Sequence, residues 1–176
     1  EFRRVLFRSA YVIPSEQTAR MDIGLARFAE RDIPVMLMVA LDVVDMPFGN
    51  SAKEAAYVAL MASVGVYVAA HPIVCAVDML NEPLPPNWPA DSSPGAFTAL
   101  EVAWRNLCNL AVPAMRAAAP DVVVIYEVGL GSIPTNWTGA SLPTFTNYVL
   151  SPHIYIRYEI THQGIPEWQA GQPLPV

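Results

Sequence analysis

The sequence predicts an α/β fold in which helices alternate with the strands of a parallel sheet. Helix-like and strand-like segments follow one another along most of the chain, which is the rhythm of a parallel sheet built from crossover connections. The strand-like segments are apolar throughout, as expected of strands that are buried on both faces. Several of them stop at polar residues, and ligands of parallel α/β proteins bind at the carboxyl ends of the strands.

The first half of the chain is predicted to hold two helices and a strand. Residues 15–31 have the apolar spacing of an amphipathic helix, which Asp32-Ile33-Pro34 ends. Val35–Leu41 is then a fully apolar strand. Ser51-Ala52-Lys53-Glu54 has the pattern of a capping box, so a second helix is expected to begin there and to end at about Ala70.

The second half is predicted to hold three strands and one helix. Ile73–Pro83 reads as a buried strand, and a Pro-rich loop separates it from a helix that begins at Pro94 and ends before Pro120. Val122–Glu127 and Asn147–Tyr155 are two further strands. An open doubly wound sheet and a closed (β/α)8 barrel both fit this order. The barrel typically needs about 250 residues, so the chain would hold about half of one.

Composition excludes several classes of protein. With 53% hydrophobic and 15% charged residues, the 176-residue chain can bury a sizeable core in one domain. Its net charge of -6 argues against a nucleic-acid partner, since binding to nucleic acid needs clustered lysine and arginine. Cys75 and Cys108 make neither a disulfide framework nor a zinc pattern. Cys75 is expected to be an inert core residue of its strand.

Two segments could be misinterpreted, one as a membrane span and the other as part of the native domain. Residues 55–80 are apolar enough to suggest a membrane span, but they contain Gly65, His71-Pro72 and Asp78, so a helix followed by a strand is expected instead. Residues 1–9 are rich in arginine and show no cap or turn that connects them to the rest of the chain. We interpret them as a cloning or adaptor remnant, with the native domain beginning near Ala10.

Glu82 is the first candidate for a catalytic residue. A long apolar strand ends at Asn81-Glu82-Pro83, which places a carboxylate at the carboxyl end of the strand. Two other predicted strands also carry polar residues at their ends, Glu127 on one and His153 with Tyr155 on the other. Because the carboxyl ends of parallel strands share one edge of the sheet, these side chains are expected at one site.

In this order the motifs resemble glycoside hydrolase family 5, the cellulase-like family of (β/α)8 retaining glycosidases. The matching pieces are the strand ending in Asn81-Glu82-Pro83 with Ala70-His71-Pro72 before it, the later Ser151-Pro-His-Ile-Tyr155, and Thr161-His-Gln-Gly164 with Trp168 nearby. The resemblance implies a partial (β/α)8 TIM barrel with about four of eight parallel strands. Residues 10–176 would be the central part of the catalytic domain. The resemblance also favours an extracellular location, although no secretory signal is visible.

The resemblance further implies a role for each matching residue. Glu82 would be the general acid/base, while Asn81, His153 and Tyr155 would bind the sugar near the bond that is cleaved. A retaining glycosidase needs a second carboxylate about 5–5.5 Å away as nucleophile. The substrate would be a polysaccharide or oligosaccharide, foremost a β-1,4-glucan, with mannan or another β-glucan next. The chemistry requires no cofactor and no metal.

The chain also departs from the family pattern. The family's nucleophile is a glutamate at the end of the strand after the His-x-Tyr strand, and the sequence reaches Val176 first. We therefore expect a fragment that lacks its nucleophile and is inactive alone. The alternative is a non-catalytic barrel relic that binds carbohydrate in the same cleft. A nucleotide-binding module is disfavoured, because Pro134 stands where the glycine fingerprint beginning at Gly129 needs its third glycine.

Weaker candidates surround this site. The loop tryptophans could stack on sugar rings: Trp88, Trp137 and Trp168. Glu127 is expected to be structural or to contact substrate rather than to act as nucleophile, and Asp78 to be a hydrogen-bonded residue inside the barrel. Asp42 and Asp45 lack the third ligand that would indicate a metal site.

Overall fold

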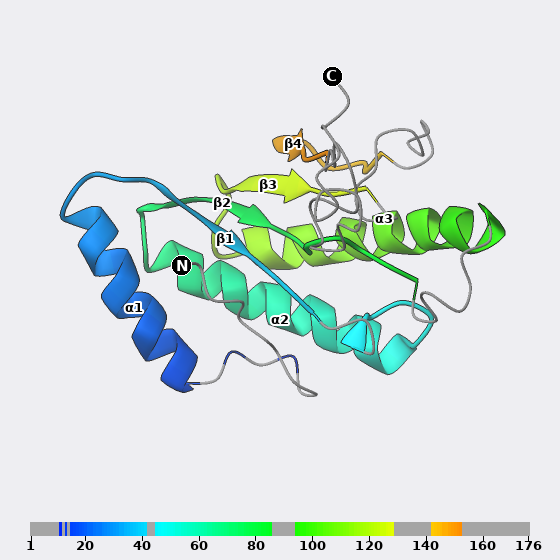
Figure 1. Cartoon of the computed structure of the whole chain (residues 1–176), viewed down its shortest axis with the longest axis horizontal. Helices are drawn as coiled ribbons and strands as arrows, with labels where there is room; N and C mark the ends of the chain where they lie inside the picture. Colours follow the sequence, from blue (N-terminus) through cyan, green and yellow to red (C-terminus); the bar gives the residue numbers. More distant parts are fainter. Residues whose placement is uncertain are drawn as a thin grey trace, which may run out of the picture.

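The computed structural model contains helices and parallel strands in alternation, and a fourth strand follows the third without an intervening helix in the described residues (Figure 1). It describes residues 11, 13, 15–41, 45–85, 94–128 and 142–152. In chain order the elements are α1 (Ser15–Ala29), β1 (Val35–Met38), α2 (Ser51–Ala69), β2 (Val74–Asp78), α3 (Pro94–Arg116), β3 (Val123–Tyr126) and β4 (Tyr148–Leu150). Each lies within or close to its predicted range, and the strands are shorter than expected.

The order of the strands decides between the two predicted architectures. All three pairings are parallel, and the strands lie in the order β1-β2-β3-β4. A doubly wound sheet reverses its strand order at a switch point, whereas a (β/α)8 barrel adds each new strand beside the last. The described part of the chain is therefore an α/β sheet with four of the eight parallel strands of a (β/α)8 barrel.

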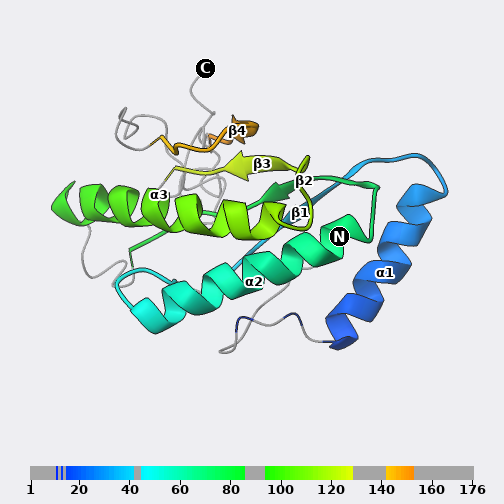
Figure 2. The ribbon, with the colours of Figure 1, turned by 180° about the vertical axis from the view of Figure 1, so that it is seen from behind.

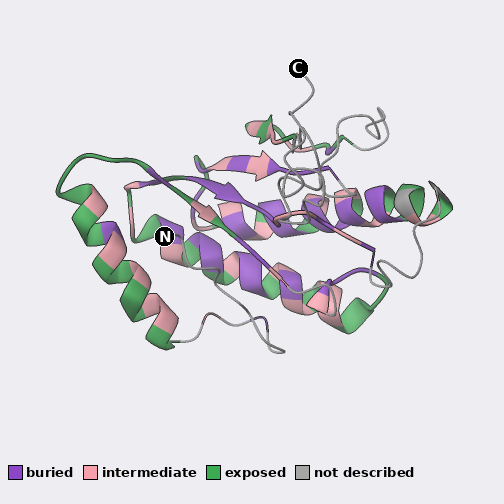
Figure 3. Ribbon diagram, viewed as in Figure 1, coloured by how far each residue is buried: buried purple, intermediate pink, exposed green. Residues whose placement is uncertain are grey.

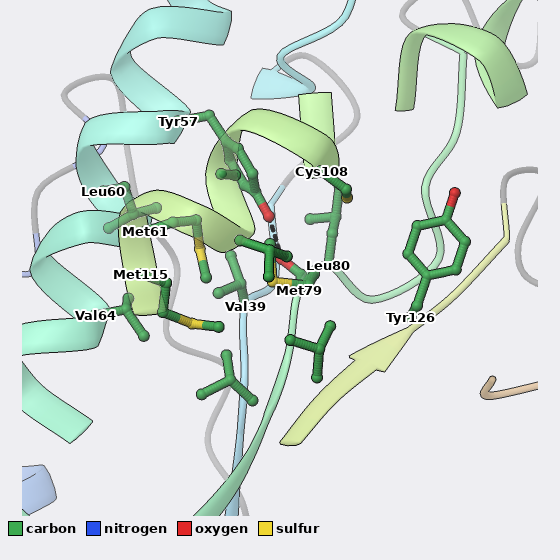
Figure 4. Close-up of a cluster of buried hydrophobic side chains, with 14 of the residues drawn as sticks. Val39, Tyr57, Leu60, Met61, Val64, Met79, Leu80, Cys108, Met115 and Tyr126 are labelled. Carbon is green, nitrogen blue, oxygen red and sulfur yellow. Dashed lines mark hydrogen bonds between the residues drawn. The ribbon is translucent and has the colours of Figure 1, made fainter. Parts of the chain in front are cut away.

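Helices α2 and α3 lie side by side on one face of the sheet (Figures 1 and 2). Between them and the sheet is the core, which includes Tyr57, Leu60, Met61 and Met115, all fully buried (Figure 4). The close approach of the two helices occurs at Gly65. A Cβ atom there would lie 2.1 Å from the backbone oxygen of Met115, so a larger residue does not fit without moving backbone.

Several residues of the strands are not buried, as the colouring in Figure 3 shows. Met36, Met38 and Val149 are exposed although they lie in strands, and the register places them on the face of the sheet opposite Val77 and Val124. Cys75 is also exposed, so the prediction that it is an inert core residue was wrong. Cys75 lies where the register between β1 and β2 shifts: Val35 lies opposite Val74 and Met36 opposite Ala76, so Cys75 is the extra residue of an irregularity that interrupts the regular alternation of faces.

The start of α2 differs from the prediction in one respect. Asn50, not Ser51, is the N-cap, and its Oδ1 accepts hydrogen bonds from the backbone N–H groups of Ala52 and Lys53, each at 3.1 Å. The Glu54 carboxylate accepts from the N–H of Gly49 at 3.2 Å. The cap therefore lies one residue earlier than the sequence suggested, and the pattern is not a reciprocal capping box, because Glu54 is the fourth helical residue and bonds to Gly49 rather than to the N–H of the N-cap.

Helix α2 is the one helix among the described residues that is long and apolar enough to cross a membrane by length and composition. Its buried residues pack into the core described above, among them Tyr57, Leu60, Val64 and Val68. Core helices of this kind satisfy the same compositional test.

Candidate active site

The candidate site lies where β2 ends between its two neighbours. Beyond Asp78 the chain keeps sheet-like hydrogen bonds on both sides. The N–H of Met79 donates to the carbonyl of Ile125 at 3.1 Å, and the N–H of Asn81 donates to the carbonyl of Val39 at 2.8 Å. Asn81 is therefore fixed at the carboxyl end of an inner strand, and Glu82 follows it directly. Both side chains are half-buried.

Glu82 has an unusual backbone conformation. Its φ is +50°, in the left-handed region that residues other than glycine rarely adopt. The residue before a proline normally has an extended backbone, and Pro83 follows. Backbone strain of this kind costs on the order of 1–3 kcal/mol and persists where surrounding contacts impose it. Such strained residues cluster at functional sites.

A hydrogen bond to the end of the neighbouring strand accompanies this strain. The N–H of Glu82 donates to Oε2 of Glu127, with 2.6 Å between nitrogen and oxygen. Glu127 comes directly after β3 and is almost completely buried, at 1% exposure. The side chain of Asp78, also buried, is hydrogen-bonded to that of Glu127.

Burial and the Asp78 charge raise the pKa of Glu127 to about 9, against an ordinary value of 4.5, while the Glu82 N–H opposes the shift. This raised pKa favours the protonated form of Glu127, which can donate a hydrogen bond to Asp78. A glycosidase nucleophile must be ionised to attack. These properties fit a structural role for Glu127 better than that of nucleophile.

Two aromatic side chains from the helices hold the backbone of the site. The indole Nε1 of Trp104 in α3 donates to the carbonyl of Glu127 at 2.7 Å, and the Trp104 ring stacks on Tyr126 with 5° between the planes. The hydroxyl of Tyr57 in α2 donates to the carbonyl of Met79 (Figure 4). The ends of β2 and β3 are thereby anchored to the helical layer.

The structure brings together only some of the predicted residues. Asn81, Glu82, Asp78 and Glu127 lie at adjoining strand ends. The other predicted sugar-binding residues lie outside the described residues: His153, Tyr155, Trp137 and Trp168, together with Trp88 and Asp42. Within the part of the chain that the structure describes, no group of three or more His, Cys, Asp or Glu side chains could hold a metal ion.

The direct contact between Glu82 and Glu127 and the pairing of Glu127 with Asp78 were not predicted from the sequence. The pairing could have been suspected, because Asp78 and Glu127 are two acidic residues at adjoining strands whose other residues are almost all apolar. Buried carboxyl groups need partners, so two of them on neighbouring strands suggest a pair. Nothing in the sequence indicates that the backbone N–H of Glu82 also binds to this pair of carboxyl groups.

No protein-family model matches the chain, and no curated protein matches it. Solved structures do. Cel5A of Thermotoga maritima, in complex with mannotriose, is 17% identical with a TM-score of 0.66 over 89% of this chain and 46% of its own. A hyperthermophilic endo-β-1,4-glucanase in complex with substrate is 18% identical with a TM-score of 0.70, over 98% of this chain and 54% of its own. The chain has the fold of these endoglucanases.

A third similar structure is the cellulose synthase subunit Z of Clostridioides difficile, 13% identical with a TM-score of 0.67 over 86% of this chain and 46% of its own. The chain thus spans about half the length of the solved structures it matches. The resemblance to glycoside hydrolase family 5 and the partial barrel predicted from the sequence are confirmed at the level of the fold. Activity and site residues are not decided by this likeness.

Proposed function

We propose that the chain is the central part of a retaining glycoside hydrolase that cleaves β-glycosidic bonds of a polysaccharide, with Glu82 as general acid/base. The observation that carries the proposal is the place of Glu82, half-buried in a strained turn directly after an inner strand of a (β/α)8-type sheet. Catalytic residues of such barrels come from the carboxyl ends of strands. The likeness to endoglucanases supports it.

The chemistry assigns Glu82 two consecutive tasks. As an acid it protonates the oxygen of the leaving sugar, and as a carboxylate it then activates the water that hydrolyses the glycosyl-enzyme. Asn81, beside it on the strand end, would bind the sugar at the cleavage point. His153, Tyr155, Trp137 and Trp168 are proposed to complete the sugar-binding surface. As the resemblance to glycoside hydrolase family 5 implies, the nucleophile is proposed to come from sequence outside the 176 residues, and the raised pKa of Glu127 argues against Glu127 in that role.

A β-1,4-glucan is the first substrate to test, followed by a mannan. The solved structures that the chain resembles include an endo-β-1,4-glucanase with substrate, and Thermotoga maritima Cel5A in complexes with cellobiose and with mannotriose. These are properties of those proteins. They define the panel of glycans with which the proposal is tested, namely soluble cellulose derivatives, cello-oligosaccharides and manno-oligosaccharides.

The test begins with the source DNA on both sides of this reading frame, so that the complete product can be expressed. Its hydrolysis of carboxymethyl cellulose is then compared with that of Glu82→Gln. Loss of the acid/base is expected to slow hydrolysis about 10²–10⁴-fold. Glu16→Gln, on the exposed surface of α1, is the matched control and should retain full activity. The 176-residue chain alone should show no turnover.

A second substrate makes the assignment specific. On 2,4-dinitrophenyl β-cellobioside the leaving group needs no protonation, so Glu82→Gln should form the glycosyl-enzyme readily and release it slowly. Added azide should restore turnover and yield a β-glycosyl azide. Equal activity of Glu82→Gln and the unmodified enzyme on cellulose would overturn the proposal. Glycan binding without any turnover in the complete product, unaffected by Glu82→Gln, would instead support the carbohydrate-binding relic.

A further inference from the structure

The turn at Glu82 is held by a chain of contacts that links two strands. Asp78 lies opposite Ile125 in the β2–β3 register, so Glu127 lies two residues further toward the carboxyl edge and on the same face of the sheet as Asp78. The Asp78 and Glu127 side chains are hydrogen-bonded to each other, and Oε2 of Glu127 accepts from the N–H of Glu82. Asp78 and Glu82 belong to the same segment, four residues apart.

Both ends of this linkage are anchored. The carbonyl of Glu127 accepts from the Trp104 indole in α3, and the N–H of Asn81 donates to the carbonyl of Val39. Glu127 is thus attached to the helical layer, and the residue before Glu82 is attached to the segment that follows β1. The short contact between Glu82 and Glu127 spans 45 residues of sequence, and its acceptor belongs to a buried acid. Together these contacts fix the backbone position of Glu82, and we call this set of contacts the Glu82 mount.

We propose that Glu127, with Asp78, is a positioning residue that holds the backbone of Glu82 in its left-handed turn and so directs the Glu82 side chain toward the substrate. The effect of this positioning on catalysis rests on the proposed function of Glu82. The contacts that hold Glu82 do not depend on that function, because they are all made within this chain. A purely structural role would let other buried side chains of the same size replace Glu127 without effect on Glu82.

Two substitutions at Glu127 separate these roles. In Glu127→Gln the amide oxygen can still accept from the Glu82 N–H, and the amide NH2 can still donate to Asp78, so the linkage is retained. Glu127→Leu has a similar size but no acceptor and no donor. Loss of the mount is therefore expected in the leucine variant and rescue in the conservative glutamine variant.

The decisive measurement is NMR on the full 176-residue chain labelled with 15N. In the unmodified chain and in Glu127→Gln, the Glu82 amide proton should resonate far downfield and exchange slowly, as expected of a short hydrogen bond to a carboxyl oxygen. In Glu127→Leu it should move upfield and exchange at least about 10-fold faster, while the amides of Met79 and Asn81 stay protected. A Glu82 amide that is unprotected in the unmodified chain, or unchanged in Glu127→Leu, would overturn the proposal.

The catalytic consequence is measured in the complete gene product. Glu127→Leu is expected to lower kcat by about 100-fold with little change in KM, since small misplacements of a catalytic group have effects of this size. Glu127→Gln should stay within a few-fold of the unmodified enzyme. If Glu127→Leu does not fold, the exchange of the Glu82 amide in the unmodified chain and in Glu127→Gln still decides the proposal. If the complete product has no activity, the proposed function fails while the NMR result still tests the mount.

Discussion

The Trp104 indole donates a hydrogen bond to the main-chain carbonyl of Glu127, which joins the middle of α3 to the end of β3 at 2.7 Å. Trp104 has no exposed surface, and its ring contacts Phe48 and Tyr57 edge-on while stacking on Tyr126. One side chain therefore connects the packing of the core to the strand end at which Glu127 contacts Glu82.

Trp104→Phe is expected to destabilise the chain by about 2–4 kcal/mol, because it leaves a cavity and a buried carbonyl without its donor. Urea unfolding followed by circular dichroism measures the change. Leu110→Ala, at an exposed position of the same helix, is the control and should change stability by less than about 0.5 kcal/mol. A Trp104→Phe variant as stable as the unmodified chain would show that the indole hydrogen bond contributes little.

Glu127 gives the stability of the chain a definite dependence on pH. In the unfolded chain its carboxyl group ionises near 4.5, whereas in the folded chain its pKa is about 9. Between these values the folded state binds a proton that the unfolded state has lost, so the free energy of unfolding falls as pH rises. The slope for one such proton is at most about 1.4 kcal/mol per pH unit.

The comparison with Glu127→Gln isolates this effect. The amide does not titrate, so the stability difference between the unmodified chain and Glu127→Gln should shift in favour of the variant as pH is raised from 5 to 9. Asp78 and Glu82 are the acidic groups next to Glu127, so the difference between the two proteins is measured rather than either profile alone. A difference that stays constant over this range contradicts the raised pKa.

Much of the fold was predictable because its signals are local. Periodicity located α1 and a capping pattern located α2, while Pro94 and Pro120 bounded α3 and apolar runs such as Val35–Leu41 located the strands. Alternation of helices and strands alone did not predict the strand order, since doubly wound sheets and barrels share it, and the partial barrel was predicted from the resemblance of the motifs. Only the pairing of β1 with β2, β2 with β3 and β3 with β4 distinguishes them.

The candidate site was predictable in part. Glu82 stands out because a carboxylate and a proline interrupt an apolar run. Its left-handed backbone and its contact with Glu127 depend on the register of two strands separated by a long helix, which no local pattern records. The exposure of Cys75 was missed for a related reason: the shift of register between β1 and β2 at this residue depends on strand pairing, which an apolar run does not record.

The start of α2 offers a test of a single hydrogen-bonding group. Asn50→Ala removes the oxygen that accepts from two N–H groups of the first turn, so we expect a loss of about 1 kcal/mol in the free energy of unfolding. Ser51→Ala is the control, because Ser51 is the first helical residue rather than the cap, and alanine suits that position. Thermal unfolding of the three proteins provides the measurement. A larger loss for Ser51→Ala than for Asn50→Ala would place the cap at the residue that the sequence suggested.

The two helical glycines of α1 and α2 should respond in opposite ways to alanine. At Gly65 a Cβ would lie 2.1 Å from the Met115 oxygen and 2.8 Å from its carbonyl carbon, so α2 and α3 must separate. Because overpacking of a dense core costs about 1–3 kcal/mol or more, Gly65→Ala should destabilise by at least that amount. At Gly24 nothing lies within 4 Å, and alanine should stabilise α1 by roughly 0.5–1 kcal/mol. Urea unfolding of both variants measures the two changes. Stabilisation by Gly65→Ala would mean that the two helices do not pack as closely as the structure has them.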